Sequence, residues 1–235
     1  MSGGFEPTGS EKKGIRDVYM EKRLFDDDTT IISARAYNLI IGVMIALGFA
    51  IDFFMAYELS NLILRIPLPA VIIAYLIMSL GGTFVVHKST SAFVSGVGFI
   101  VMAIGMGLLL TFFLNEYNLS AVYLSFGITA AITIIMMILG TIMPNLFLSI
   151  GKSLGIALLI AIIVEIVCSF FFRGALEVVD FVIIPIFCGY IGYDWARAQK
   201  YPKTANNAID AAADLYIDIV NVLIRILEIV GDSKS

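Results

Sequence analysis

The stretch GYIGYDWARAQ, residues 189–199, closes an otherwise apolar run with one aspartate, Asp194. The later stretch DLYIDIVNVLIRIL, residues 214–227, places Asp218 between two isoleucines. A carboxylate is costly in hydrocarbon, so such residues usually face a cavity, a partner or a functional site. These two stretches therefore bear on both the fold class and the position of the site.

The composition predicts a membrane protein. Hydrophobic residues make up 60% of the chain, charged residues only 14%, and the mean hydropathy is +0.96. That leaves too little polar surface to enclose a soluble core. A net charge of -4 excludes a basic surface for nucleic acid. Cys168 and Cys188 both fall in apolar runs, so we expect no disulfide, no resident metal and no cofactor.

Apolar runs long enough to cross the bilayer as helices predict an all-α integral membrane protein with seven transmembrane helices. The expected spans are 38–57, 67–86, 92–114, 121–143, 153–172, 177–195 and 209–230. We expect three parts: a polar amino-terminal tail at 1–36, a membrane domain at 37–231 and a short tail at 232–235. The polar start of the chain also predicts that no signal peptide is removed.

The distribution of basic residues predicts the orientation. One side has the basic residues of the tail and of the even-numbered connections: Lys12, Lys13, Arg16, Lys22, Arg23, Arg35, Lys88, Lys152, Arg197, Lys200 and Lys203. The other side has Arg65, Arg173 and Lys234. This bias places the amino terminus in the cytosol and the carboxyl terminus outside.

On this topology Asp194 lies near the cytosolic end of the sixth span, and Asp218 lies about 13 Å of helix rise into the seventh. The two carboxylates are therefore expected to meet within the membrane, on its cytosolic side. The last helix carries a polar stripe, spaced by four, three and four residues, that cannot face lipid: Asp214, Asp218, Asn221 and Arg225. We expect Asp214 to be solvated, and a purely structural role for Asp218 and Arg225 remains open.

Two further acidic residues stand in apolar runs. Glu165, near the middle of the fifth span, is expected to line an ion path or to contact the polar stripe. Asp52 is expected nearer the outer interface. Small residues in the third span are expected to allow close helix packing: Gly96, Gly98, Gly105 and Gly107.

Three segments resemble the Bax inhibitor-1 family, also called the transmembrane BAX inhibitor motif proteins. They are GYDW at 192–195, ADLYIDIVNVLIRILEIVG at 213–231 and FGITAAITIIMMILG at 126–140. The resemblance implies six helices surrounding a buried carboxyl-terminal helix and a pH-sensitive calcium leak channel. It also implies a di-aspartyl pH sensor and gate, at positions that match Asp194 and Asp218.

The second helix departs from the family pattern. Relatives carry an arginine at its cytosolic end that latches one aspartate in the closed state, whereas this chain offers His87 and Lys88. Neither residue is equivalent to a forked, always charged guanidinium. His87 is nearest the latch position, and as the only histidine it would add pH sensitivity. An exposed histidine at the headgroups is the alternative.

We therefore expect a calcium leak in which Asp194 and Asp218 bind calcium transiently and share a proton when closed. No enzymatic activity is expected, and the short charged tail suggests a bacterial plasma membrane. One alternative is a non-transporting regulator that binds a membrane protease or a cell-death protein. Another is an intramembrane aspartyl protease, although the residues before Asp218 lack the glycines of such enzymes.

Overall fold

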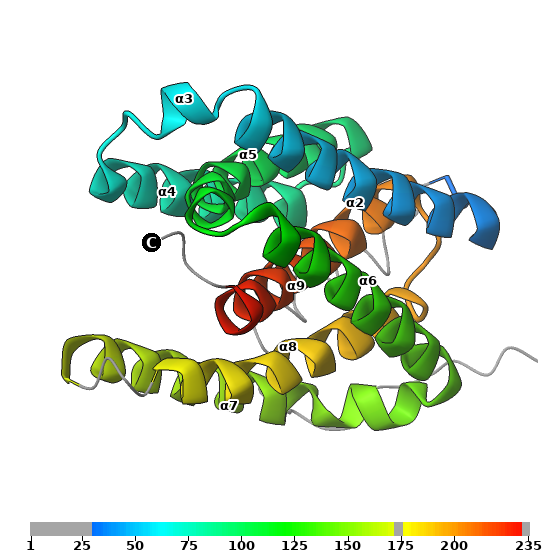
Figure 1. Cartoon of the computed structure of the whole chain (residues 1–235). Helices are drawn as coiled ribbons and strands as arrows, with labels where there is room; N and C mark the ends of the chain where they lie inside the picture. The colour runs from blue at the N-terminus through cyan, green and yellow to red at the C-terminus, as the bar shows by residue number, and fades with distance from the viewer. Residues whose placement is uncertain (1–29, 172–175, 232–235) are drawn as a thin grey trace, which may run out of the picture.

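The computed structural model describes residues 30–171 and 176–231, and the regular elements in these ranges are helices (Figure 1). In chain order they are α2 (Ala34–Tyr57), α3 (Ser60–Ile63), α4 (Leu68–Lys88), α5 (Ala92–Glu116), α6 (Leu119–Ile142), α7 (Pro144–Phe171), α8 (Leu176–Ala198) and α9 (Ala205–Val230). The predicted tails lie outside the described residues, except for residues 30–36. Within that segment α2 already begins before the predicted domain boundary.

Polar side chains fix where several helices begin. The side chains of Ser33, Asn118 and Thr204 each accept a hydrogen bond from the backbone three residues on, at 3.2, 2.8 and 3.1 Å. Each bond satisfies an amide that has no partner within the helix, which is the ordinary role of an N-cap.

Six helices in the described part of the chain are long and apolar enough to cross a membrane: α2, α4, α5, α6, α7 and α8. The fifth predicted span was placed too late, because α7 begins at Pro144 and not near residue 153. A proline at the first helical position loses no hydrogen bond, so the MPN motif starts this helix directly after α6. Lys152 consequently lies within α7 and not in a connection.

The last helix, α9, has a mostly buried surface. Nineteen of its residues are buried, and it packs against α2, α5, α6 and α8 (Figure 1). The buried set includes four aspartate or asparagine residues of its first three turns: Asn206, Asn207, Asp210 and Asp214. The polar groups of α9 are therefore held among other helices.

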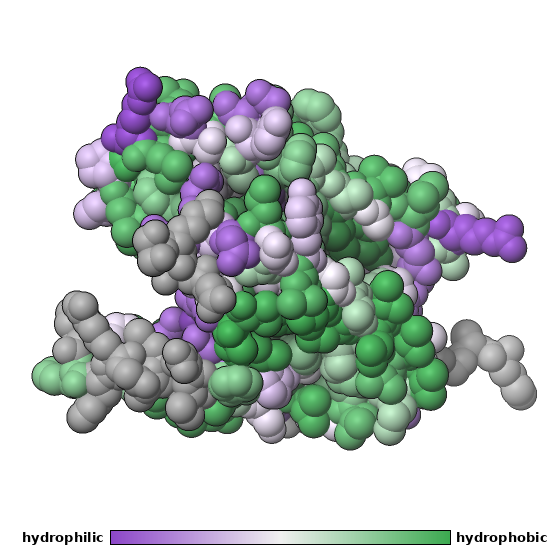
Figure 2. Space-filling view, viewed as in Figure 1, coloured by the Kyte–Doolittle hydropathy of each residue, from purple (hydrophilic) through white to green (hydrophobic). Residues whose placement is uncertain are grey.

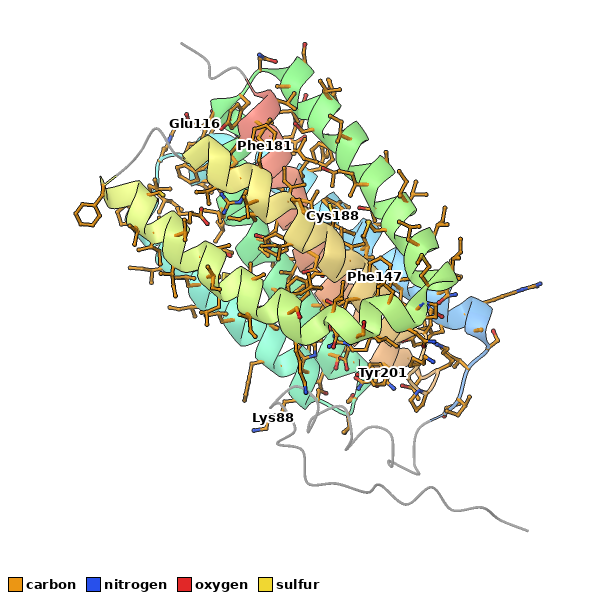
Figure 3. The ribbon with its side chains drawn as sticks, turned by 90° about the horizontal axis from the view of Figure 1, so that it is seen from below. Lys88, Glu116, Phe147, Phe181, Cys188 and Tyr201 are labelled. Atoms are coloured by element: carbon orange, nitrogen blue, oxygen red, sulfur yellow. The ribbon has the colours of Figure 1, made fainter. Side chains whose placement is uncertain are left out.

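The outer surface of the bundle is apolar. Hydrophobic residues cover most of the helix lengths on the face in Figure 2, and hydrophilic residues gather toward the helix ends. Figure 3 shows Lys88 and Tyr201 at one end of the bundle, the end where α8 connects to α9, and Glu116 at the other. We call these the junction end and the opposite end.

Glycines bring α4 and α5 close together. A Cβ on Gly98 would lie 2.9 Å from Val85, and one on Gly105 would lie 2.9 Å from Met78, both on α4. Gly107 instead faces α2. The predicted packing role is confirmed for these three residues and is wrong for Gly96, whose Cβ would meet nothing within 4 Å.

Candidate functional site

The sequence-predicted aspartate of α8 lies in an ion pair at the junction end. Asp194 is 3% exposed, and its Oδ1 lies 2.8 Å from an η nitrogen of Arg197, one turn further along the helix. Arg197 is itself buried. The last turn of α8 therefore holds a carboxylate and a guanidinium side by side, which is the spacing at which helical side chains of opposite charge meet.

The same guanidinium reaches across to α9. An η nitrogen of Arg197 donates to Asp214 Oδ2 at 2.6 Å, and His87 Nε2 of α4 lies 3.1 Å from Asp214 Oδ1. Three helices, α4, α8 and α9, are thus tied together by charged groups. We call His87, Asp194, Arg197 and Asp214 the junction cluster.

Two predictions about this region are wrong. Asp214 is not solvated but 6% exposed, because the first turns of α9 are buried. Arg197 is not a charge of a cytosolic connection, since it lies inside α8 and points into the cluster. The spacing of three residues between Asp194 and Arg197 was the signal in the sequence that would have placed the arginine.

The two basic residues predicted at the latch separate. His87 joins the junction cluster through Asp214. Lys88 is exposed, with its ammonium 5.2 Å above the ring of Phe84 on its own helix, and lies at the rim of the bundle (Figure 3). Of the two, His87 is the one that contacts the junction cluster, and a role as a latch stays a prediction.

Asp218 lies one helical turn beyond Asp214 on α9. Both are 6% exposed, and four residues correspond to about 6 Å of rise along the same face. A sensor that pairs Asp218 with Asp194, and their transient binding of calcium, stay predictions.

The connection between α8 and α9 is fixed by hydrogen bonds. Tyr37 of α2 donates to the carbonyl of Ala198 at 3.0 Å, and Lys203 donates to the same carbonyl at 3.0 Å. The Lys203 ammonium also lies 4.4 Å above the Tyr37 ring, and burial lowers the pKa of Lys203. Asn206 then donates to the Ser89 carbonyl at 3.0 Å, which joins the start of α9 to the end of α4.

A second charge cluster lies toward the opposite end. An η nitrogen of Arg225 donates to Glu165 at 2.7 and 2.9 Å, and the other donates to Asp180 at 2.7 Å and to Glu228 at 3.2 Å. We call Glu165, Asp180, Arg225 and Glu228 the distal cluster. The predicted contact between Glu165 and the polar stripe is confirmed, whereas its place on an ion path remains a prediction.

A cavity of about 170 Å³ adjoins the distal cluster. Glu165, Asn221 and Arg225 line it, together with apolar residues of α4 and α5. Asn221 donates to the Ile217 carbonyl of its own helix at 2.8 Å. The polar stripe of α9 therefore passes from one charge cluster to the other.

Asp52 lies near the end of α2, as predicted, and is buried. It is 2% exposed, and both of its carboxylate oxygens lie within 2.8 Å of the Tyr216 hydroxyl of α9. This partner was not predicted, because it is 164 residues away in the chain and has no signal near Asp52 in the sequence. A place for Asp52 at the membrane interface stays a prediction.

A family model described as "Inhibitor of apoptosis-promoting Bax1" matches residues 30–235. The chain belongs to the Bax inhibitor-1 family. The match includes every residue of the junction and distal clusters, and it confirms the resemblance carried by GYDW and by the last helix. Among the curated proteins, none matches the chain.

Family membership and the apolar helices together establish a multi-pass membrane protein. Within residues 30–171 and 176–231, no group of three or more histidine, cysteine, aspartate or glutamate side chains is placed to hold a metal ion.

Proposed function

We propose that this member of the Bax inhibitor-1 family is a pH-sensitive calcium leak whose gate is formed by the junction cluster together with Asp218. The observation that carries the proposal is the Arg197 guanidinium held between Asp194 and Asp214, with His87 on the far side of Asp214. In this proposal α9 is a seventh membrane-crossing helix inside a ring of six, and the junction end faces the cytosol.

The polar groups of α9 supply the path. Charged residues buried in a membrane protein face a cavity or one another, and here they extend along one helix between two clusters. Calcium takes oxygen ligands, so carboxylates that become accessible to water attract it and replace part of its hydration shell. Opening of the junction cluster would present Asp194, Asp214 and Asp218 to the ion.

Protonation favours the closed state in this mechanism. A charged imidazole on His87 attracts Asp214 and holds α4 against α9, and histidine is the side chain whose ordinary charge change falls between about pH 5 and 8. A proton shared between Asp194 and Asp218 acts in the same direction, because two nearby carboxylates resist ionising together. Loss of these protons weakens the ties between α4, α8 and α9, and the leak rises with pH.

A regulator that binds a partner protein is the second candidate. The family description names inhibition of an apoptosis-promoting protein, and a regulator of that kind needs no ion path. An aspartyl protease is disfavoured, because the residues before Asp218 lack the glycines of such enzymes. We assign no cofactor and no enzymatic step to the chain.

Reconstitution of the purified chain into calcium-free liposomes separates these functions. The proposal predicts calcium entry that increases from acidic to neutral pH on the junction side. Cleavage of a membrane-spanning peptide without flux would establish the protease. A folded protein that gives neither flux nor cleavage would contradict the leak and leave the regulator.

The orientation has its own test. Lys200 is exposed in the connection between α8 and α9, so a Lys200→Cys variant in a background without Cys168 and Cys188 presents one accessible thiol. We expect a membrane-impermeant thiol reagent to label it only after the cytosolic face is opened. An Arg65→Cys variant, exposed on the other side, serves as the control and should be labelled in intact cells. The reverse pattern would overturn the orientation.

A further inference from the structure

A cavity of about 790 Å³ lies between α2, α5 and α6, apart from both charge clusters. Its walls come from four helices: Phe49, Asp52, Phe53, Ala56 and Tyr57 of α2, Ser60 of α3, Leu114 and Asn115 of α5, and Leu119, Val122, Tyr123 and Phe126 of α6. Small-molecule sites have volumes of roughly 300 to 1,000 Å³ and are mostly apolar with a few placed polar groups. This cavity has both properties.

Asp52 is the one carboxylate among these lining residues. The Tyr216 hydroxyl lies 2.8 and 2.7 Å from its two oxygens, but a phenol carries one hydrogen and donates to one oxygen at a time. The carboxylate therefore keeps acceptor capacity for a second partner. A Cβ on Gly107 would lie 3.0 Å from Asp52 Oδ1, so the glycine makes the room in which the carboxylate sits.

Aromatic side chains line the same cavity as this carboxylate. Five of the lining residues are aromatic: Phe49, Phe53, Tyr57, Tyr123 and Phe126. Phe53 and Tyr57 stack with ring centroids 5.7 Å apart and an interplanar angle of 6°. Aromatic faces attract cations, and cages of such rings recognise quaternary ammonium groups. A carboxylate within an aromatic cavity is complementary to an organic cation.

The cavity opens sideways, toward the surface that faces lipid. Phe53, Tyr57 and Tyr123 line it and are 67%, 71% and 72% exposed on the apolar exterior. In Figure 1, α9 is seen between α2 and α6, the two helices that carry most of the lining. A compound that partitions into the bilayer can reach this opening directly.

We propose that this cavity binds a hydrophobic organic ammonium compound. The cation pairs with Asp52, and the apolar part lies among the aromatic side chains of α2 and α6. The proposal goes beyond the calcium leak and does not depend on it. It does connect the ligand to the last helix, because the cation would share the carboxylate that Tyr216 of α9 contacts.

Equilibrium dialysis of the full chain in a nonionic detergent tests the proposal. The probe is radiolabelled 6-phenylhexyl-trimethylammonium, and empty micelles give the background. Its neutral carbon isostere, with a tert-butyl group in place of trimethylammonium, is the competitor. We expect the isostere to bind at least about tenfold more weakly, a difference of about 1.4 kcal/mol.

Variants locate the bound cation. Asp52→Asn keeps an oxygen that accepts from Tyr216 and removes the charge, so the probe should bind about tenfold more weakly while the fold survives. Glu58→Gln removes an exposed carboxylate next to the same end of α2, outside the cavity, and should leave binding unchanged. Ala56→Phe fills the cavity and should weaken both probe and isostere.

Three results would overturn the proposal. Equal binding of probe and isostere would mean an apolar groove that takes a lipid chain. Unchanged binding by folded Asp52→Asn would remove the carboxylate from the site. An equal loss in Glu58→Gln would mean attraction by surface charge. If Asp52→Asn does not fold, the comparison of probe with isostere on the unaltered chain decides.

Discussion

The junction and distal clusters are built alike, and their differences assign them different roles. Each places one arginine among carboxylates and joins α8 to α9. In the junction cluster the side chains of Arg197, Asp194 and Asp214 are 7%, 2% and 5% exposed. In the distal cluster those of Arg225, Glu165 and Glu228 are 16%, 29% and 23% exposed. His87 of the junction cluster, at 19%, and Asp180 of the distal cluster, at 8%, do not follow this difference. Arg225 and its two glutamates are therefore better screened by water or headgroups than Arg197 and its two aspartates.

The two clusters also differ in the helix that joins α8 and α9. In the junction cluster this helix is α4, which contributes His87, whereas in the distal cluster it is α7, which contributes Glu165. Histidine changes charge near neutral pH and glutamate ordinarily does not. A closely packed cluster that contains a histidine suits a gate. A more exposed cluster with an excess of carboxylates suits a pore entrance that attracts cations.

The largest expected effect is on stability. Arg197→Gln leaves Asp194 and Asp214 buried without their cation, which typically costs about 3 to 5 kcal/mol. Arg225→Gln leaves better-hydrated carboxylates and should cost clearly less. Thermal unfolding of both variants in the same detergent measures the difference. Equal losses of stability in the two variants would show that the two clusters do not differ in how well their charges are hydrated.

The next effect concerns the pH response. His87→Ala removes the tie between α4 and α9, so the calcium leak at acidic pH should rise several-fold and its dependence on pH should flatten. His87→Arg places a permanent positive charge beside the Asp214 carboxylate and should keep the calcium leak low at every pH measured. Lys88→Ala, next in sequence but outside the cluster, is the matched control. If His87→Ala and Lys88→Ala give the same curve as the unaltered chain, the histidine is not a latch.

The smallest effect is expected in the distal cluster. Glu165→Gln removes one of three carboxylates around Arg225 and should lower the calcium flux by about twofold through weaker attraction of the ion. The midpoint of the pH response should stay where it is, because the gate lies at the other end. Flux measured over a pH series at low ionic strength checks both statements. A shifted midpoint would place gating at the distal cluster as well.

The sequence predicted the helices better than their partners. Apolar runs placed six of the long helices closely, and the one large error came from treating Pro144 as a break when it is the first residue of α7. Asp194 stood out because a charge in an apolar run is costly wherever it folds. Arg197 was missed because orientation rules count basic residues by position and do not show which way a side chain points.

Contacts between residues far apart in the chain could not be predicted from local sequence patterns. Asp180 and Arg225 are 45 residues apart, and Asp52 and Tyr216 are 164 apart. Hydrophobic periodicity shows which face of a helix is buried, but not which neighbour covers it. The polar stripe of α9 was visible for that reason, while the carboxylates around Arg225 were only partly anticipated through Glu165.

In the proposed gate, Asp194 and Asp218 act together as the pH sensor. Calcium flux against pH in liposomes, for Asp194→Asn, Asp218→Asn and the double variant, tests it most directly. A carboxamide is close to a carboxyl in size, so packing should survive. We expect each single variant to lose most of the pH dependence and the double variant to resemble them, because residues that act as a unit are not additive. Full pH dependence in both folded single variants would show that the pair is structural and that the gate lies elsewhere.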